Sequence, residues 1–571
     1  MGGACDGRWR NGKVRPKHYS YDKRTQACAG TSAFGGRNCS GAGTNGRPPR
    51  TSTQETDSER WNVTTPASDI IKEIQDLYLS DPVPWIIGYS GGKDSTASLQ
   101  LVWKAIAALP KERRQKTVHV ISTDTLVENP IIAAWVENSL LCIKLAAANQ
   151  DLPFKAHRLT PALENRFWVN LIGRGYPAPR PKFRWCTDRL KISASTQFIH
   201  DLSESSGEAI LVLGQRRGES AARDKVMDHY SGSTRERLSR NKDPKLARVW
   251  VYLPIETWSS DDVWEYIITE PNPWGVDNQE LFSIYRGATA DAECPVVVDK
   301  STPSCGDSRF GCYVCTMVTQ DKSMQAMIQN DDQKRWMQPI LDYRNRYLAV
   351  KDRPLRDFRR MNGRLTVFKG ELVHGPYTQE YRAELLRELL QTQRVVQDAA
   401  RSQGSGAIEL ISLEELDEIR RIWLEEKREI EDLVPSIYEE AYGERYPGRD
   451  LEPLPLDRSD LSILRHVASE LDPEAADELY KLTRSLLGTQ FQTMQTQKRS
   501  KHLDRLEGIL QFHAFRNADE ALEFALSDRE AHVDRAESRT PLEGLELEIG
   551  STDVDAPELM DEPAEQAPRR L

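Results

Sequence analysis

Ser90-Gly91-Gly92-Lys93-Asp94-Ser95-Thr96 is the segment of this sequence that decides its fold. It follows the apolar run Trp85–Tyr89, which predicts a short buried strand, and it opens the helix predicted over Ser95–Leu109. Two glycines let the backbone approach a phosphate group closely, and the first turn of a helix supplies unpaired N–H donors. The segment, called the nucleotide loop below, therefore predicts a phosphate-binding turn.

The residues around the nucleotide loop alternate between predicted helices and strands. Helices are expected over Ala67–Leu79 and Pro130–Asn149, and strands over Thr117–Ser122 and Ala209–Gly214. This order is typical of an α/β domain with a doubly wound parallel sheet, and we place that domain at residues 65–290. Ligands of such sheets bind beyond the carboxyl ends of the strands, where the nucleotide loop is expected.

The nucleotide loop differs from a Walker A loop and resembles another phosphate-binding motif. A Walker A loop needs glycine where Ile87 stands and serine or threonine where Asp94 stands. The loop is similar to the SGGxDS PP-loop of ATP pyrophosphatases, whose domain is of the adenine nucleotide alpha hydrolase type. This resemblance implies cleavage of ATP between the α- and β-phosphates with Mg²⁺, and catalytic roles for Lys93 and Asp94. It also implies ATP binding by Ser90, Gly91, Gly92, Lys93, Asp94, Ser95 and Thr96. The alternative is an ordinary turn at a helix N-terminus.

Two other segments are candidates for the nucleotide site. Asp124 follows the strand Thr117–Ser122, where a carboxylate can meet a ribose or a metal ion. Gly214–Arg223 follows a later strand and resembles the G-x-R-x-x-E-S-x-x-R segment of the reductase-like branch of the family. In that resemblance Arg216 and Arg223 hold phosphate or sulfate groups bidentately. The alternative is a charged, solvated helix start.

The cysteines are concentrated in one part of the chain. Nine cysteines among 571 residues are too few for a disulfide scaffold. Four of them lie within 22 residues, in the region that we delimit at 291–330: Cys294, Cys305, Cys312 and Cys315. Four thiolates suit either Zn²⁺ or a 4Fe–4S cluster, and the presence of a single C-x2-C pair slightly favours the cluster. The alternative is a set of free thiols.

Cys186 stands apart, in the segment Lys182-Phe183-Arg184-Trp185-Cys186-Thr187-Asp188-Arg189-Leu190-Lys191. Neighbouring cations lower the pKa of a thiol, so Arg184, Arg189 and Lys191 predict a reactive thiolate. We interpret Cys186 as a catalytic nucleophile that carries sulfur. The alternatives are an unreactive cysteine in a basic loop and a further cluster ligand. Cys142 lies on an apolar helix face and is expected in the core.

The flanking regions differ in charge. Residues 1–60 hold 11 basic and 5 acidic residues with almost no apolar periodicity, which predicts a disordered basic extension. Residues 405–527 have helical periodicity and predict a helical C-terminal region, with a capping box at Ser412 and Glu415. Residues 528–571 hold 13 acidic and 5 basic residues and predict a disordered acidic tail.

A basic segment, delimited at 331–400, separates the cysteines from the helical region. Within it, residues 333–370 hold 11 basic and 3 acidic residues, interleaved with Trp336, Tyr343, Tyr347 and Phe358. Basic residues contact phosphates and aromatic faces stack on unpaired bases, so the segment predicts a DNA contact. The alternatives are a helix whose aromatic residues face the core and a docking face for another subunit.

The composition excludes several classes of protein. The net charge of −10 excludes a uniformly basic nucleic-acid coat protein. No apolar run reaches the length of about 18 residues that a membrane span needs. The first 30 residues contain no apolar signal-peptide core. The sequence therefore predicts a cytoplasmic protein with no membrane partner.

The order of these motifs resembles the DNA phosphorothioation sulfurtransferase family, DndC. The resemblance covers about residues 65–530 and includes Arg309-Phe310-Gly311-Cys312-Tyr313-Val314-Cys315-Thr316, whereas residues 1–60 have no counterpart in it. It implies a 4Fe–4S cluster on the four clustered cysteines, cleavage of ATP to AMP and pyrophosphate, and partners that include DNA, a cysteine desulfurase and other Dnd subunits. In this restriction-modification chemistry, sulfur replaces a non-bridging oxygen of a DNA phosphate. Rival hypotheses are an assimilatory phosphoadenosine phosphosulfate reductase and a non-catalytic DNA-sensing subunit.

Overall fold

The computed structural model describes residues 65–217, 234–235, 237–241, 243–289, 310–402, 408–449, 456, 458–494 and 502–537. The chain divides into two compact units, Met1–Glu59 and Arg60–Leu571, and all of the described residues belong to the second unit. The expected basic extension at 1–60 and most of the expected acidic tail lie outside the described residues.

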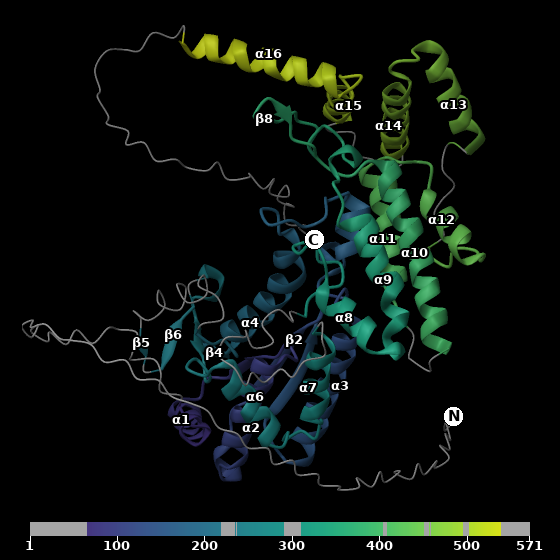
Figure 1. The fold of residues 1–571 in the computed structure, drawn as a ribbon. Coiled ribbons are helices and arrows are strands. Elements are labelled where there is room, and N and C mark those ends of the chain that lie inside the picture. Colours follow the sequence, from purple (N-terminus) through teal and green to yellow (C-terminus); the bar gives the residue numbers. More distant parts are fainter. Residues whose placement is uncertain are drawn as a thin grey trace, which may run out of the picture. The chain divides into compact units, whose positions relative to one another are not determined.

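A seven-stranded sheet forms the centre of the N-terminal domain (Figure 1). Its strands are, in spatial order, β3 (Phe154–Leu159), β2 (Val118–Thr123), β1 (Trp85–Gly88), β4 (Ala209–Val212), β7 (Val249–Tyr252), β6 (Leu238–Arg240) and β5 (Thr234–Arg235). Strands β3, β2, β1, β4 and β7 are parallel to their neighbours in this series. Strand β6 pairs antiparallel with β7, and β5 pairs antiparallel with β6. The prediction of a doubly wound, mostly parallel sheet is confirmed.

Strand β1 lies at the point where the strand order reverses direction. Ile86 of β1 pairs with His119 of β2 on one side and with Leu211 of β4 on the other. Both β1 and β4 are buried, which explains their continuous apolar sequences. The nucleotide loop follows β1 directly, so it emerges at the switch point where sheets of this class bind ligands.

Helices cover both faces of the sheet. Helix α4 (Ser193–Ser206) packs on one face, where Ile199 joins a small core with Ile86 and Leu211. The opposite face lies in the main core, together with α1 (Ala67–Ser80), α2 (Lys93–Ala107), α3 (Pro130–Asn149), α6 (Ser260–Thr269) and α7 (Asn278–Gly287). In α6, Ser259 caps the helix with Asp262 in a capping box and Trp264 is fully buried.

Helix α3 is long and apolar enough to pass the length and hydropathy criterion for a membrane span, and core helices also pass it. Its inner face, which includes Trp135 and Ile143, is buried in the core. Leu141 and Leu145 on the outer face are each 55% exposed. Cys142 is half-buried and packs against the core, close to its predicted environment.

The C-terminal region is helical, as predicted. Its helices are α8 (Lys322–Asn330), α9 (Gln338–Tyr343), α10 (Gln379–Ser402), α11 (Leu413–Arg421), α12 (Leu433–Tyr442), α13 (Arg458–Leu471), α14 (Ala476–Met494), α15 (His502–Phe512) and α16 (Ala518–Glu537). The capping box of Ser412 and Glu415 is present at α11. Helix α16 ends at Glu537, so the segment 528–537 is helical and the predicted start of a disordered tail at 528 is wrong.

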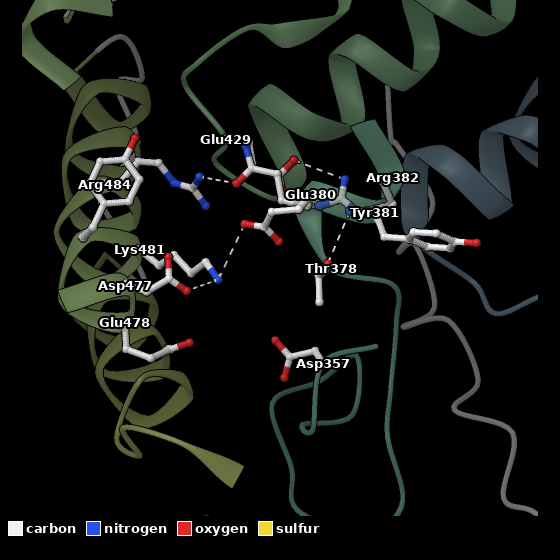
Figure 2. Close-up of polar contacts among 12 residues, drawn as sticks. Asp357, Thr378, Glu380, Tyr381, Arg382, Glu429, Asp477, Glu478, Lys481 and Arg484 are labelled. Atoms are coloured by element: carbon white, nitrogen blue, oxygen red, sulfur yellow. Dashed lines mark hydrogen bonds and ion pairs between the residues drawn. The ribbon is translucent and has the colours of Figure 1, made fainter. Parts of the chain in front are cut away.

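Buried ion pairs hold the C-terminal helices together. Arg382 of α10 binds Glu429 with both side chains buried, and Arg484 of α14 binds Glu431 at 2.7 Å. Figure 2 shows Lys481 of α14 between Asp477 and Glu380. A short hairpin of β8 (Val367–Phe368) and β9 (Glu371–Leu372) precedes α10. Single helical turns complete the elements, at Lys111–Arg113, Leu163–Asn165, Val169–Arg174, Thr187–Ile192, Pro244–Leu246, Asp332–Met337, Arg344–Leu348, Arg353–Leu355 and Ile422–Glu426.

Candidate functional site

Internal hydrogen bonds fix the shape of the nucleotide loop. The Ser90 and Ser95 hydroxyl oxygens lie 3.1 Å apart, and the Ser95 hydroxyl donates to the Gly92 carbonyl at 3.0 Å. Gly91 has a φ of +73°, a conformation that favours glycine, and its carbonyl accepts a hydrogen bond from the Trp135 indole at 2.9 Å. The loop is therefore preorganised, with the N-terminus of α2 beside it.

Asp94 joins two cations at the start of α2. Its Oδ2 lies 2.9 Å from the Lys93 ammonium, and its Oδ1 accepts a hydrogen bond from Arg216 Nε at 2.5 Å. The Arg216 side chain is only 8% exposed and also donates to the Trp258 carbonyl. Because each of its carboxylate oxygens faces a cation, Asp94 orders the loop and holds two positive charges beside the N-terminus of α2.

The end of β4 touches the nucleotide loop at Gly214. A Cβ atom on Gly214 would lie 2.6 Å from the Asp94 carbonyl oxygen and 2.8 Å from the Ser95 nitrogen. Only glycine allows this approach, and it brings Arg216 to the loop. The structure thus gathers the candidate residues Ser90 to Thr96 with Arg216, whereas Arg223 lies outside the described residues.

Asp124 lies at the same edge of the sheet but is held by its neighbours. Its Oδ1 accepts a hydrogen bond from the Leu126 backbone at 2.8 Å, and its Oδ2 forms an ion pair with Arg158. This carboxylate shapes the loop after β2, and its contact with a ribose or a metal ion stays a prediction.

The segment Phe310–Thr316, called the cysteine loop below, docks on the loop that follows β2. Cys312 pairs with Glu128 in an isolated antiparallel bridge, and the Tyr313 backbone donates to the Val127 carbonyl at 3.0 Å. The Cys315 backbone donates to the Cys312 carbonyl at 3.0 Å, which places the two cysteines on one tight turn. The turn therefore lies at the carboxyl edge of the sheet.

Tyr285 of α7 connects the cysteine loop with the nucleotide loop. Its hydroxyl accepts a hydrogen bond from the Lys93 backbone at 3.3 Å, and its ring centroid lies 4.6 Å from that of Phe310. The two loops, which are far apart in sequence, thus meet through one side chain. The sequence interpretation did not identify Tyr285 or Trp135, since a single aromatic residue in a helix has no distinguishing pattern.

Cys186 lies near the cysteine loop, but its environment differs from the prediction. Burial and the nearby Cys315 raise the pKa of the Cys186 thiol, and Lys191 lowers it too little to compensate. Arg189 instead donates to Asn165 and Tyr176, and Arg184 is exposed. The expected activation of this thiol by three surrounding cations is therefore wrong.

Glu128 and Lys191 form an ion pair beside Cys312. The Lys191 ammonium lies 3.4 Å from Glu128 Oε1, which also accepts hydrogen bonds from the Thr125 hydroxyl at 2.9 Å and the Cys312 thiol at 3.7 Å. Burial raises the pKa of the Cys312 thiol to about 12, and Glu128 adds to that effect. The role of Glu128 was not visible in the sequence, because its partner Cys312 lies 184 residues away.

The structure describes two of the four cysteines that are expected to bind a metal cluster. Cys312 and Cys315 share one turn, and Cys186 lies close enough to Cys315 to influence its charge. Cys294 and Cys305 lie outside the described residues. Among the residues that the structure does describe, no group of three or more histidine, cysteine, aspartate or glutamate side chains is arranged to hold a metal ion.

Several side chains of the basic segment are buried, although the sequence predicts that they contact DNA. Trp336 and Tyr343 are buried in the core, which contradicts their predicted role in stacking on bases. Arg344 is buried and donates to the Cys315 carbonyl at 2.8 Å, so it supports the cysteine loop. Arg359 is also buried and binds Asp357 and Glu478.

Comparison with known proteins assigns the N-terminal domain. The phosphoadenosine phosphosulfate (PAPS) reductase domain family matches residues 84–282. These residues, about a third of the chain, are similar to that domain. An uncharacterised protein of Methanocaldococcus jannaschii is 28% identical over 201 residues, which are 35% of this chain and 35% of that protein. The match thus spans about a third of the relative's length.

Two solved structures resemble the chain weakly. The PAPS reductase of Candida auris, in a phosphate complex, is 12% identical over 36% of this chain and 81% of its own, with a TM-score of 0.24. The U34-tRNA thiolase NcsA of Methanococcus maripaludis, with its 4Fe–4S cluster, is 14% identical over 50% of this chain and 83% of its own, with a TM-score of 0.23. Scores this low carry no argument about substrates.

Proposed function

We propose that this chain is a cytoplasmic, ATP-dependent sulfurtransferase of DNA phosphorothioate modification, working with a cysteine desulfurase and other Dnd subunits. The observation that carries the proposal is the meeting of the nucleotide loop and the cysteine loop at one edge of the sheet, through Tyr285. A nucleotide site and a set of thiols at one place support nucleotide-dependent sulfur chemistry. The match to the PAPS reductase domain supports the same class of reaction.

In the first step, a non-bridging oxygen of the DNA phosphate attacks the α-phosphorus of ATP. A new phosphorus–oxygen bond forms, and the bond between the α-phosphorus and the pyrophosphate oxygen breaks, so pyrophosphate leaves. A bound Mg²⁺ would neutralise charge on the phosphates. Lys93 and Arg216, both held by Asp94, are placed to neutralise the charge that builds up on the phosphates. The N–H groups at the start of α2 add hydrogen bonds to the same oxygens. The DNA phosphate then carries AMP as a leaving group.

In the second step, hydrosulfide attacks the DNA phosphorus; it is released when a thiol reductant supplies two electrons to the persulfide that the desulfurase forms. The phosphorus–sulfur bond forms, the sulfur loses its proton, and AMP leaves with the original oxygen. Cys312 and Cys315, with Cys294 and Cys305, would hold a 4Fe–4S cluster, which supplies a site for handling sulfur near the activated phosphate. Cys186 is close to these thiols and suits either a sulfur carrier or a further ligand.

The proposal is tested by following ATP labelled at its α-phosphate. We expect AMP and pyrophosphate from the wild type, and a loss of about 100-fold or more for Lys93→Ala with an unchanged melting temperature. Lys104→Ala is the matched control, because Lys104 lies on the same helix and pairs with Glu270 away from the loop. Sulfite release from PAPS without ATP cleavage would instead support an assimilatory reductase.

A further inference from the structure

Two arginine side chains share one carboxylate near the cysteine loop, and a third arginine lies close to one of them. Arg180 Nη2 lies 3.4 Å from Asp352 Oδ2, and Arg356 Nε lies 3.5 Å from Asp352 Oδ1. Arg360 is close enough to Arg356 to repel its charge. Asp352 also accepts a hydrogen bond from the Tyr377 hydroxyl at 3.2 Å, so its single negative charge is shared among several donors.

The positive charges of Arg180 and Arg356 share one carboxylate, that of Asp352. The Arg356 side chain is only 11% exposed. Its Nη1 donates to the His374 carbonyl at 3.3 Å, whereas its Nε, 3.5 Å from Asp352 Oδ1, makes no hydrogen bond to the described residues. Burial lowers the pKa of Arg356, and repulsion from Arg180 and Arg360 lowers it further despite Asp352. Buried guanidinium groups without full pairing are costly, which favours a bound anion at this place.

Further basic residues lie on the turn that precedes Cys186 in the chain. Arg180 and Phe183 exchange two backbone hydrogen bonds, at 3.1 and 2.8 Å, and form a tight turn. Lys182 and Arg184 in and beside this turn are exposed. Arg180, Lys182 and Arg184 of this turn, together with Arg356 and Arg360, are called the cationic patch below; Arg180 and Arg356 share the carboxylate of Asp352.

The cationic patch adjoins the cysteine loop directly. The Thr316 hydroxyl donates to the Pro179 carbonyl, one residue before Arg180 and one residue after Cys315. The same turn leads along the chain to Cys186. An anion held by the patch would thus lie beside the thiols, at the side where Cys186 and Cys315 approach each other.

We propose that the cationic patch binds the phosphodiester backbone of DNA and holds one phosphate beside Cys186 and the cysteine loop. This inference rests on the proposed function and deepens it by naming where the DNA lies. Guanidinium groups bind phosphate oxygens in a planar, bidentate manner. Five cations spread over two chain segments suit a polyanion better than one small anion.

The test measures binding of the full-length protein to a labelled DNA duplex at several salt concentrations. The double variant Arg180→Gln/Arg360→Gln should bind about tenfold more weakly and reduce the salt slope by about two, since each phosphate contact contributes about one. The control Lys72→Gln/Arg401→Gln removes two cations that are 76% and 70% exposed and lie outside both the patch and the basic segment. It should retain wild-type affinity and slope.

A second variant tests the same patch with substitutions that should not disturb folding. Lys182→Gln/Arg184→Gln changes exposed side chains, so the melting temperature should be unchanged. We expect its affinity for DNA to fall about threefold or more, with a lower salt slope. If both variants bind DNA as the wild type does, the patch is not the DNA site, although the proposed function can stand. If inorganic pyrophosphate displaces DNA from the wild type but not from Arg180→Gln/Arg360→Gln, the patch is a product site. If the wild type neither binds DNA nor releases pyrophosphate, the proposed function itself is wrong.

Discussion

Replacing Gly214 with alanine tests whether the contact between β4 and the nucleotide loop is needed for catalysis. The new methyl carbon would lie 2.6 Å from the Asp94 carbonyl oxygen, and the next nearest atoms also belong to the backbone of the loop. To reach an ordinary contact distance, the backbone at Gly214 and the backbone of the nucleotide loop would have to move apart by roughly 0.8 Å. No side-chain rotation can provide this displacement. The shift would carry Arg216 away from Asp94 and widen the phosphate site.

We expect Gly214→Ala to lower kcat/KM for pyrophosphate release by about 10- to 100-fold, because displacements near 1 Å in a preorganised site have effects of this size. Overpacking should also cost about 1–3 kcal/mol of stability, measured by urea denaturation. Gly508→Ala is the matched control, since an added Cβ there meets nothing within 4 Å and the residue lies inside α15. Wild-type turnover in Gly214→Ala would refute the proposed geometry of the site.

Three further predictions concern other parts of the molecule. Burial alone would raise the pKa of Glu478, but hydrogen bonds from His513 and Arg359 hold it at about 2. The ionised carboxylate therefore stabilises the fold fully above about pH 4.5, and this stabilisation is lost as the pH falls towards 2. Glu478→Gln should lower the free energy of unfolding by about 2–3 kcal/mol at pH 7 and by little at pH 2, measured by chemical denaturation. Cys312→Ser should remove iron from anaerobically purified protein, measured by metal analysis, whereas Cys142→Ser should retain it; stoichiometric zinc would contradict the cluster. Cys186→Ser should abolish phosphorothioate formation, and its visible spectrum distinguishes a sulfur carrier, which leaves the cluster intact, from a ligand.

The local features of the site could be predicted from the sequence. The nucleotide loop, the central strands and Arg216 were found because each is carried by a short contiguous pattern. The edge strand Phe154–Leu159 was missed, since its polar residues Lys155, His157 and Arg158 hide the strand signal. In the basic segment, the spacing of Trp336, Ile340, Tyr343 and Tyr347 is one helical stripe, and it could have indicated a core face.

The long-range contacts of the site could not be predicted. The bridge between Glu128 and Cys312, and the contact of Tyr285 with both loops, depend on tertiary packing between distant segments. The pKa of Cys186 was misjudged for the same reason. Sequence neighbours suggested three cations, but the fold directs Arg189 to Asn165 and buries the thiol. Charged residues that neighbour a group in the sequence therefore do not determine the charges that surround that group in the fold.

The central claim is that ATP cleavage at the nucleotide loop drives the transfer of sulfur to DNA. The most direct measurement is mass spectrometry of nuclease-digested DNA from cells that carry this chain with a cysteine desulfurase and the proposed partner subunits. We predict phosphorothioate-linked dinucleotides with the wild type and none with Lys93→Ala at equal protein abundance. Phosphorothioate at wild-type levels with Lys93→Ala, or none with the wild type and all partners present, would contradict the claim.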